Sequence, residues 1–381
     1  MTAERTLLVG VATRSQPLSD TREHLRELSR LAWTAGAEVI DEVVQTRQSF
    51  DPTTLIGAGK LSEIRERCEC DAIDLVIFDD DLTGSQAKAV TKGLGLDEAT
   101  GEPLRRVLDR SGLILDIFAR NARTRESRLQ VEIAQLQYML PRLTRAWVHF
   151  GQQGGGIGTR GPGETQLEVD RRRARDRLSM LKKTLVDIEV QREAQSEKRR
   201  RGRTFSVALA GYTNAGKSTL LNAMTKAGVL SQDKLFSTLE ATSRRLWLGQ
   251  EEDGKSVECV LSDTVGFIRK LPHHLVASFR STLSVVGAAD LVLHLVDGSA
   301  LGRDEEMRVA REVLDELCGG DAPRQLVFTH VDLLDRTDRE RLADLYPDAL
   351  QVSGTQREGL DTLRTFLKER AQAFRSGSAA S

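Results

Sequence analysis

Residues 206–226 constrain the fold more than any other segment, because an apolar run, a glycine-containing turn and a helix-forming run follow one another without a gap. The turn has the pattern Gly-x-x-x-x-Gly-Lys-Ser, from Gly211 to Ser218. Glycines allow backbone N–H groups to turn inward around an anion, and the helix that follows points its positive end at the same anion. The segment therefore predicts a buried strand, a phosphate-binding loop and a helix.

Two side chains at the end of this loop have specific expected roles. We expect the Lys217 ammonium to approach the β and γ phosphates of a nucleotide and to assist catalysis. We expect the Ser218 hydroxyl to bind Mg²⁺, which prefers oxygen ligands. The residues predicted to contact the nucleotide here are Gly211, Tyr212, Thr213, Asn214, Ala215, Gly216, Lys217, Ser218 and Thr219.

A second candidate phosphate contact follows the apolar run at residues 257–263, which ends in Asp263, Thr264, Val265 and Gly266. An aspartate at a strand end can hold magnesium through water, and the Gly266 N–H can meet a γ phosphate. In the run KLFSTLEATSRR, between the two segments, Thr238 is a candidate second magnesium ligand and catalytic residue.

The base-reading element is expected after the apolar run RQLVF, where Thr329, His330, Val331 and Asp332 follow one another. The Asp332 carboxylate can accept hydrogen bonds from both N1–H and N2–H₂ of guanine, which are contacts that adenine cannot provide. This element therefore favours GTP over ATP.

The 381-residue chain is too long for one ordinary core. We predict an α/β protein in four parts: a small α/β domain (1–114), a helical hairpin with a basic linker (115–203), a P-loop G domain with a mainly parallel sheet covered on both faces (204–375), and a disordered tail (376–381).

Within the first part, residues 6–12 and 73–79 have the composition of buried strands. A helix is expected between them, capped at Ser19 or Asp20 and stopped by Gly36.

Two helices are expected in the second part, because apolar residues recur at helical spacing in two stripes. One stripe runs from Leu129 to Leu140 and meets Pro141, which kinks or ends a helix. The other runs from Ala174 to Ile188. The glycine-rich residues 151–164 between them cannot hold a regular helix, since glycine costs about 1 kcal/mol per residue there. The pattern predicts an antiparallel hairpin with an irregular tip.

Charge is strongly segregated although the net charge is only -1. Residues 171–203 contain ten Arg and three Lys against five Asp and Glu, so this stretch carries 13 - 5 = +8. Such a segment can bind RNA phosphates, or it can be a solvated helix face held by pairs between neighbouring residues. Trp147, His149 and Phe150 can stack on bases or pack within the hairpin.

Other sites are not favoured. The IGAGK sequence at residues 56–60 lacks the full phosphate-loop spacing and a hydroxyl residue after the lysine, so it favours a structural turn before a helix. Cys68 and Cys70 lack further zinc ligands nearby, and we expect all four cysteines to be reduced. We also expect a cytoplasmic protein without a membrane span, since no apolar run reaches about 20 residues and no signal peptide is present.

With these motifs in place, the chain resembles the HflX-type GTPases, a ribosome-associated branch of the translation-factor-like GTPases. The resemblance covers nearly the whole chain, and its most specific portions are DPTTLIGAGKLSEI, LDRSGLILDIFARNARTRESRLQVEIAQLQYMLPRLTR, GGGIGTRGPGETQLEVDRR, GYTNAGKST, LFSTLEATSRR and DTVGFIRKLPHHLVASFRSTL. It implies a monomer in the cytosol that binds the large ribosomal subunit and its RNA and acts on stalled or stressed ribosomes.

The resemblance also implies roles for single residues. Ser218 and Thr238 bind magnesium, and Asp263 to Gly266 form the second switch. The first switch consists of Phe236, Ser237, Thr238, Leu239 and Glu240, and the loop behind guanine consists of Ser353, Gly354 and Thr355. The chain departs from the family in base recognition, where Asn-Lys-x-Asp is usual: Thr329 lacks the bridging amide and His330 replaces the lysine that covers the base.

Hydrolysis is expected to be slow, because Phe267 stands after Gly266 where Ras-like switches have a glutamine that orients water. Lys217, Mg²⁺ and the first-switch backbone can still stabilise phosphoryl transfer, and we expect the ribosome to stimulate it. Two alternatives remain: a P-loop ATPase or dual-nucleotide NTPase that remodels RNA or ribosomes, and a nucleotide-stabilised RNA-binding module without useful turnover.

Overall fold

The computed structural model describes residues 3–143, 166–200, 204–225, 235–236, 241–251, 254–270, 285–318 and 323–377. Predictions for Trp147, His149, Phe150, the glycine-rich residues 151–164 and most of the tail lie outside this range. The chain divides into an N-terminal unit, residues 1–120 and 128–186, and a C-terminal unit, residues 121–127 and 187–381.

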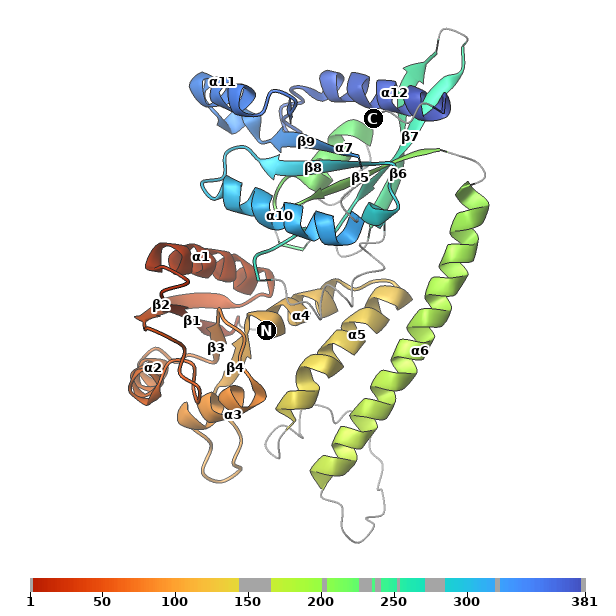
Figure 1. The fold of residues 1–381 in the computed structure, drawn as a ribbon. Coiled ribbons are helices and arrows are strands. Elements are labelled where there is room, and N and C mark those ends of the chain that lie inside the picture. The colour runs from red at the N-terminus through yellow and green to blue at the C-terminus, as the bar shows by residue number, and fades with distance from the viewer. Residues whose placement is uncertain are drawn as a thin grey trace. The chain divides into compact units, whose positions relative to one another are not determined.

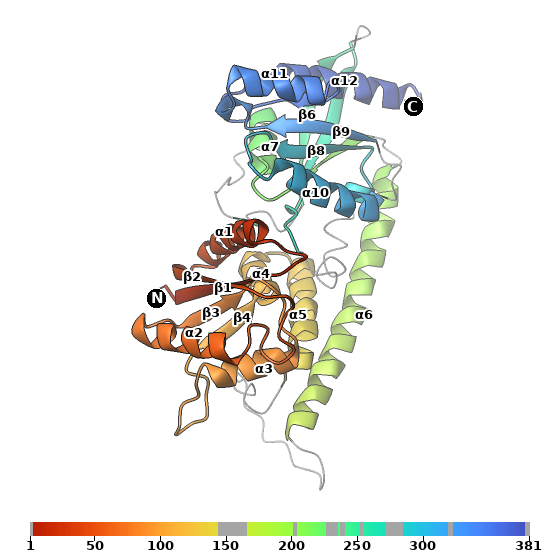
Figure 2. The same ribbon diagram turned by 60° about the vertical axis from the view of Figure 1, so that its left-hand side comes forward.

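A four-stranded sheet forms the centre of the N-terminal unit, with the order β2-β1-β3-β4 and all neighbouring strands parallel (Figure 1). Figure 2 shows α1 on one face and α2 and α3 on the other. The strands are β1 (Arg5–Ala12), β2 (Glu38–Thr46), β3 (Leu75–Phe78) and β4 (Arg106–Asp109). The helices around them are α1 (Leu18–Thr34), α2 (Ala58–Cys70), α3 (Gly84–Gly93) and α4 (Arg110–Asn121).

Two local expectations in this unit have different outcomes. The predicted cap at Ser19 or Asp20 is wrong, because α1 begins at Leu18 with Pro17 as its N-cap. The Pro17 carbonyl accepts the first helical hydrogen bond, from Thr21 N at 3.0 Å, so the helix starts directly after the proline. The structural turn at IGAGK is confirmed: Gly57, with φ +82°, precedes α2 directly.

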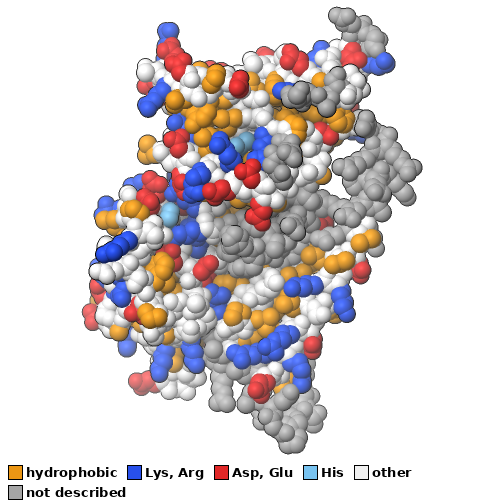
Figure 3. All heavy atoms as spheres, viewed as in Figure 1, with side chains coloured by type: hydrophobic (Ala, Val, Ile, Leu, Met, Phe, Trp, Pro, Cys, Tyr) orange, Lys and Arg blue, Asp and Glu red, His pale blue; other side chains and the backbone are white. Residues whose placement is uncertain are grey.

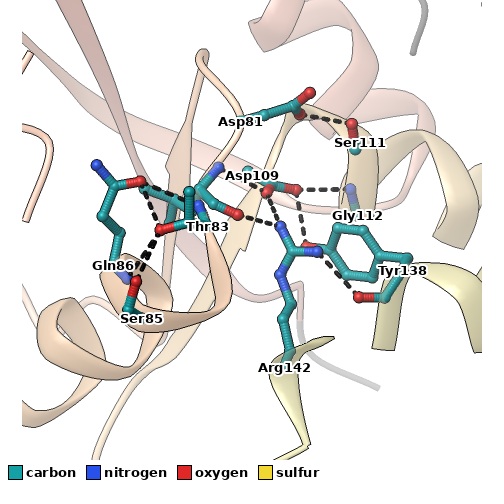
Figure 4. Close-up of polar contacts among 10 residues, drawn as sticks. Asp81, Thr83, Ser85, Gln86, Asp109, Ser111, Gly112, Tyr138 and Arg142 are labelled. Atoms are coloured by element: carbon teal, nitrogen blue, oxygen red, sulfur yellow. Dashed lines mark hydrogen bonds and ion pairs between the residues drawn. The ribbon is translucent and has the colours of Figure 1, made fainter. Parts of the chain in front are cut away.

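The Asp109 carboxylate anchors the chain beyond α5 (Arg125–Met139) to the carboxyl end of the sheet (Figure 4). Its Oδ2 accepts hydrogen bonds from Arg142 Nη2 at 2.5 Å and Leu82 N at 3.0 Å. Its Oδ1 accepts from Gly112 N at 2.9 Å and the Tyr138 hydroxyl at 2.7 Å. Arg142 closes the short helix η1 (Leu140–Arg142), so this buried cluster fixes where the first helix of the hairpin ends.

The predicted helices of the hairpin are α5 and α6 (Gln166–Arg200), and Figures 1 and 2 show them side by side. Helix α5 ends at Met139, and η1, which contains Pro141, begins at the next residue, so the predicted break at this proline is confirmed. Arg177 on α6 donates to Glu132 on α5 at 2.8 Å, and Leu181 of the apolar stripe is buried. The stripe therefore faces its partner helix as the spacing predicted.

A six-stranded sheet with the order β10-β9-β8-β5-β7-β6 forms the C-terminal unit. Neighbouring strands are parallel except for β6 and β7, so the predicted mainly parallel α/β fold is confirmed. Figure 1 shows α10 on one face and α7 and α12 on the other. The strands are β5 (Phe205–Gly211), β6 (Thr242–Gln250), β7 (Ser256–Asp263), β8 (Leu291–Asp297), β9 (Arg324–Thr329) and β10 (Leu350–Gln351).

The helices of this unit fill the connections between strands. Those that the structure describes between and after the strands are α7 (Lys217–Thr225), α10 (Arg303–Cys318), η3 (Val331–Leu333), α11 (Arg336–Leu345) and α12 (Leu360–Arg375). Leucine and valine side chains of β5, β7, β8, α7 and α12 share one buried core, including Leu209, Leu221, Leu261, Leu293 and Leu367. None of the helices that the structure describes combines the length and apolar composition needed to cross a membrane.

Candidate functional site

The predicted phosphate loop connects the carboxyl end of β5 to the start of α7, as expected. Its backbone takes two left-handed turns, at Asn214 with φ +63° and at Gly216 with φ +71°. A Cβ atom at Gly211 would lie 2.2 Å from the Leu295 carbonyl oxygen of β8, so only glycine fits there. The glycine spacing that defines the motif therefore reflects both loop curvature and the close approach of the neighbouring strand.

Lys217 opens α7 and is buried. Its Nζ donates to the Tyr212 carbonyl at 2.6 Å and to the Gly211 carbonyl at 3.2 Å. Burial lowers the pKa of Lys217 to about 8, although the nearby Asp263 carboxylate partly opposes this effect. The ammonium is thus held inside the loop by two neutral carbonyls, a poor substitute for the oxygens of a phosphate.

Ser218 and Asp263 meet across the sheet, as the sequence led us to expect. Strand β7 pairs with β5 so that Leu209 lies opposite Asp263 at its carboxyl end. The Ser218 hydroxyl donates to Asp263 Oδ2 at 2.5 Å. A hydroxyl and a carboxylate oxygen this close form a hard-oxygen donor set, which is what Mg²⁺ prefers.

The second predicted switch is joined to the phosphate loop by backbone hydrogen bonds. Phe267 N donates to Gly211 O at 3.0 Å, and Thr213 N donates to Phe267 O at 2.7 Å. A Cβ at Gly266 would lie 2.9 Å from Lys217 Nζ, so its backbone directly abuts the lysine that is predicted to meet the phosphates. The Phe267 side chain is buried in the core, where it cannot orient a water molecule.

The base-reading segment follows β9 and reaches the phosphate loop. The Thr329 hydroxyl donates to the carbonyl of Ala215 or of Val296, each at 3.2 Å. Thr329 therefore links to the phosphate loop without the amide that the family usually has. Asp332 lies in η3, and among the described residues its buried Oδ1 accepts no hydrogen bond. A buried oxygen of this kind requires a donor, and guanine provides one.

The loop predicted to back the guanine also lies against α7. A Cβ at Gly354 would lie 3.1 Å from the Thr219 side chain. Ser353 is buried and its hydroxyl accepts from Gln356 N at 3.0 Å, while Thr355 is exposed. Segments separated by more than 130 residues in the sequence thus meet at the start of one helix.

The first switch is described only at its beginning. Phe236 is buried with φ +58°, and its carbonyl accepts a hydrogen bond from Asn121 Nδ2 at 2.9 Å. Ser237, Thr238, Leu239 and Glu240 lie outside the described residues. Their predicted contacts, including magnesium binding by Thr238, stay predictions.

Two residues near these segments were missed by reasoning from the sequence. Asn121, the last residue of α4, contacts Phe236 of the predicted first switch, and no motif signals it. Asp297 ends β8 and its Oδ2 lies 3.2 Å from His330 Nδ1. The place of Asp297 directly after an apolar run could have indicated a site residue, because polar residues at the carboxyl ends of parallel strands commonly face a ligand site.

Comparison with known proteins gives the family. Three family models match successive parts of the chain: a GTP-binding GTPase N-terminal model at residues 22–119, a GTP-binding GTPase middle-region model at 121–199, and a 50S ribosome-binding GTPase model at 206–330. The GTPase HflX of Caldanaerobacter subterraneus subsp. tengcongensis is 45% identical over 94% of this chain and 79% of its own length. The chain belongs to the GTPase HflX family. The Escherichia coli GTPase HflX is 40% identical over 91% of this chain and 79% of its own length.

Membership of the HflX family settles the class of reaction. The protein binds GTP and hydrolyses it, and the predicted P-loop ATPase alternative is not supported by these relatives. A crystal structure of a protein called SsGBP with GDP covers 97% of this chain and 99% of that one, with 22% identity and a TM-score of 0.52. This likeness supports the fold alone.

Proposed function

We propose that the protein is a GTP-dependent switch that binds the large ribosomal subunit in its GTP form and leaves after hydrolysis, acting on stalled or stressed ribosomes in the cytoplasm as a monomer. The observation that carries the switch is the contact of Gly266 with Lys217. Gly266 lies so close that a Cβ there would be 2.9 Å from Lys217 Nζ, so a γ phosphate that drew the lysine from its two carbonyl contacts would change the surroundings of the second switch.

Magnesium is part of this proposal. Ser218 is the proposed direct ligand, Asp263 the partner that holds the ion through water, and Thr238 the second protein ligand in the GTP state. The 2.5 Å hydrogen bond from Ser218 to Asp263 supports the donor set, because the hydroxyl oxygen keeps lone pairs for an ion while its proton stays directed at the carboxylate. Bound magnesium would neutralise charge on the β and γ phosphates.

Guanine recognition is assigned to Asp332, with Ser353 to Thr355 behind the base and Thr329 linking the segment to the phosphate loop. The buried Oδ1 of Asp332, which lacks a donor among the described residues, supports this assignment. Adenine presents an N1 acceptor at the same position, so it would leave this oxygen unsatisfied at a cost of about 1–3 kcal/mol.

Turnover by the isolated protein is proposed to be slow. Lys217 and Thr238 would stabilise the developing charge together with a bound ion, but the buried Phe267 supplies no group to orient water. Completion of the site by the ribosome would raise the rate.

The hairpin is proposed as the RNA-binding arm. Figure 3 shows Lys and Arg side chains along α6, interspersed with hydrophobic ones. Arg172, Arg173, Arg175, Lys182 and Lys183 are exposed on this helix. Exposed cations in series bind phosphates with strong dependence on salt. The description of the matching G-domain family as a 50S ribosome-binding GTPase supports the large subunit as the partner.

Two measurements test the switch. Large subunits are pelleted with the protein bound to a non-hydrolysable GTP analogue or to GDP, and we expect clear enrichment with the analogue. Phosphate release is then measured with GTP and ATP, with and without subunits, using Lys217→Ala to give the background. Equal pelleting in both nucleotide states would refute the switch, and equal rates with ATP would refute guanine selectivity.

The arm is tested separately. Replacing Arg172 and Arg173 together by glutamine is expected to weaken subunit binding and reduce its salt dependence, while leaving GDP affinity unchanged. Replacing the exposed Arg336 and Arg341 of α11 by glutamine is the matched control. If both double variants bind subunits equally well, α6 is not the RNA-binding surface.

A further inference from the structure

We infer that His330, positioned by Asp297, forms a wall of the guanine nucleotide site and makes nucleotide affinity depend on pH. The inference rests on the proposed guanine site and goes beyond it, because it assigns a pH-sensitive residue and a positioning residue that the family's usual motif does not contain.

The backbone of His330 directs its side chain towards the phosphate loop. His330 has φ +54°, a left-handed conformation that is uncommon for residues other than glycine. Its ring atoms Cε1 and Nε2 both lie 3.4 Å from the position of a Cβ on Gly216. Strained residues of this kind persist where the surrounding structure holds them, frequently at ligand sites. The imidazole therefore lies against Gly216 of the phosphate loop.

Asp297 holds the His330 ring through the ring nitrogen Nδ1. Its Oδ2 lies 3.2 Å from His330 Nδ1, and its Oδ1 accepts from Ser299 N at 2.9 Å and from the Ser299 hydroxyl at 2.7 Å. Burial raises the pKa of Asp297, but the hydrogen bonds from His330 and Ser299 outweigh burial and lower it overall. Asp297 is thus an anion that fixes Nδ1 as a donor and leaves Nε2 towards the phosphate loop.

The charges around the ring determine the sign of the pH effect. Asp297 ends β8, Asp332 lies two residues beyond His330, and Lys217 of the phosphate loop directs its Nζ at two carbonyls. Arg303, at the start of α10, donates to the Gly298 carbonyl. A bound nucleotide adds several negative charges, which favour the imidazolium form. Affinity is therefore highest at low pH and falls as pH rises through the titration range of the imidazole.

The decisive measurement is the Kd of a fluorescent GDP analogue between pH 5.5 and 8.5 for the full-length protein and for His330→Lys. Lysine keeps a cation at this position that does not titrate in the range, and both proteins share the titration of GDP and of Lys217. The ratio of the two Kd values therefore isolates His330. We expect the wild-type protein to lose about five- to tenfold in affinity relative to His330→Lys across the range.

Asp297→Asn tests the positioning role, because it retains the shape of the side chain and removes its charge. We expect its pH profile to move to lower pH, since the imidazolium has lost its counterion. A uniform loss of affinity at every pH would overturn the positioning role and leave Asp297 a structural residue.

The GDP titrations distinguish a failure of the His330 role from a failure of the proposed guanine site. A Kd ratio that is constant with pH would overturn the role of His330, while GDP binding itself remained intact. Absence of saturable GDP binding by both proteins at every pH would instead refute the guanine site on which the inference depends.

Discussion

Replacing Lys217 by methionine is expected to abolish nucleotide binding and yet to stabilise the nucleotide-free C-terminal unit at pH 7. The pKa of Lys217 is lowered by burial from its ordinary value of 10.5 to about 8. At 1.36 kcal/mol per pH unit, this difference means that keeping the charged lysine folded costs roughly 3 kcal/mol at neutral pH. Methionine is a similarly long, apolar side chain without this cost.

The hydrogen bonds of Lys217 reduce the expected gain. Its two bonds to carbonyl oxygens contribute about 1 kcal/mol each. Both carbonyls keep another donor in the variant, because Gly211 O accepts from Phe267 N and Tyr212 O accepts from Ala215 N. Lys217→Met is therefore expected to raise the free energy of unfolding by about 1 kcal/mol at pH 7.

The sign of this effect is expected to reverse with pH. A lysine whose pKa falls on folding binds fewer protons in the folded state, so its cost is complete below about pH 8 and disappears as pH rises towards 10.5. Near pH 9 the remaining cost, about 2 kcal/mol, equals the hydrogen-bond contribution. At pH 10 we therefore expect Lys217→Met to be less stable than the wild-type protein.

Urea unfolding of nucleotide-free protein, followed by tryptophan fluorescence, measures this difference. Trp247 lies on β6 in the sheet of the C-terminal unit, and Trp33→Phe and Trp147→Phe form the background so that Trp247 alone reports. Lys255→Met, at an exposed lysine, controls for general effects of pH. A destabilisation at pH 7 that stays constant up to pH 10 would refute the reasoning.

Three further predictions follow from single contacts. Gly266→Ala places a Cβ 2.9 Å from Lys217 Nζ, so we expect it to weaken the binding of a GTP analogue at least about tenfold more than the binding of GDP in equilibrium titrations. Equal losses of affinity for the two nucleotides would contradict the switch contact. Asp332→Asn replaces one acceptor oxygen of the carboxylate with an NH₂ donor. Competition binding is therefore expected to show a shift in preference from guanosine diphosphate to xanthosine diphosphate, whose C2 carbonyl accepts a hydrogen bond from this NH₂ group. Asp109→Asn weakens the buried pair with Arg142 and is expected to destabilise the N-terminal unit by about 3 kcal/mol without changing GDP affinity; an unaltered urea midpoint would show that the charge is dispensable.

Local sequence patterns predicted the elements whose signal lies within one segment. The apolar runs of β5 and β8 are buried on both faces, and those of β7 and β9 are buried at their carboxyl ends, so their composition indicated parallel strands. Strands β2, β4 and β6 were not anticipated. β4 has only two apolar residues, Val107 and Leu108, and the nine residues of β6 open with the polar run Thr-Ser-Arg-Arg, so neither has the continuous apolar run that marked β3.

Contacts between distant segments could not be read in the same way. Nothing in the neighbourhood of Asp297 indicates that it faces His330, because their approach depends on the pairing of β8 with β9, which places Asp297 opposite Thr329. The contact of Asn121 with Phe236 joins residues 115 positions apart and has no local pattern at all.

The sequence by itself determined the phosphate loop, the order of the nucleotide-binding segments and the helical pair, because glycine conformation, side-chain chemistry and hydrophobic periodicity act over a few residues. Only the tertiary structure decided that Lys217 is buried against two carbonyls, that Phe267 packs into the core and that Asp297 holds His330. These three facts depend on burial and on the register of neighbouring strands, which arise only when segments far apart in the chain pack together.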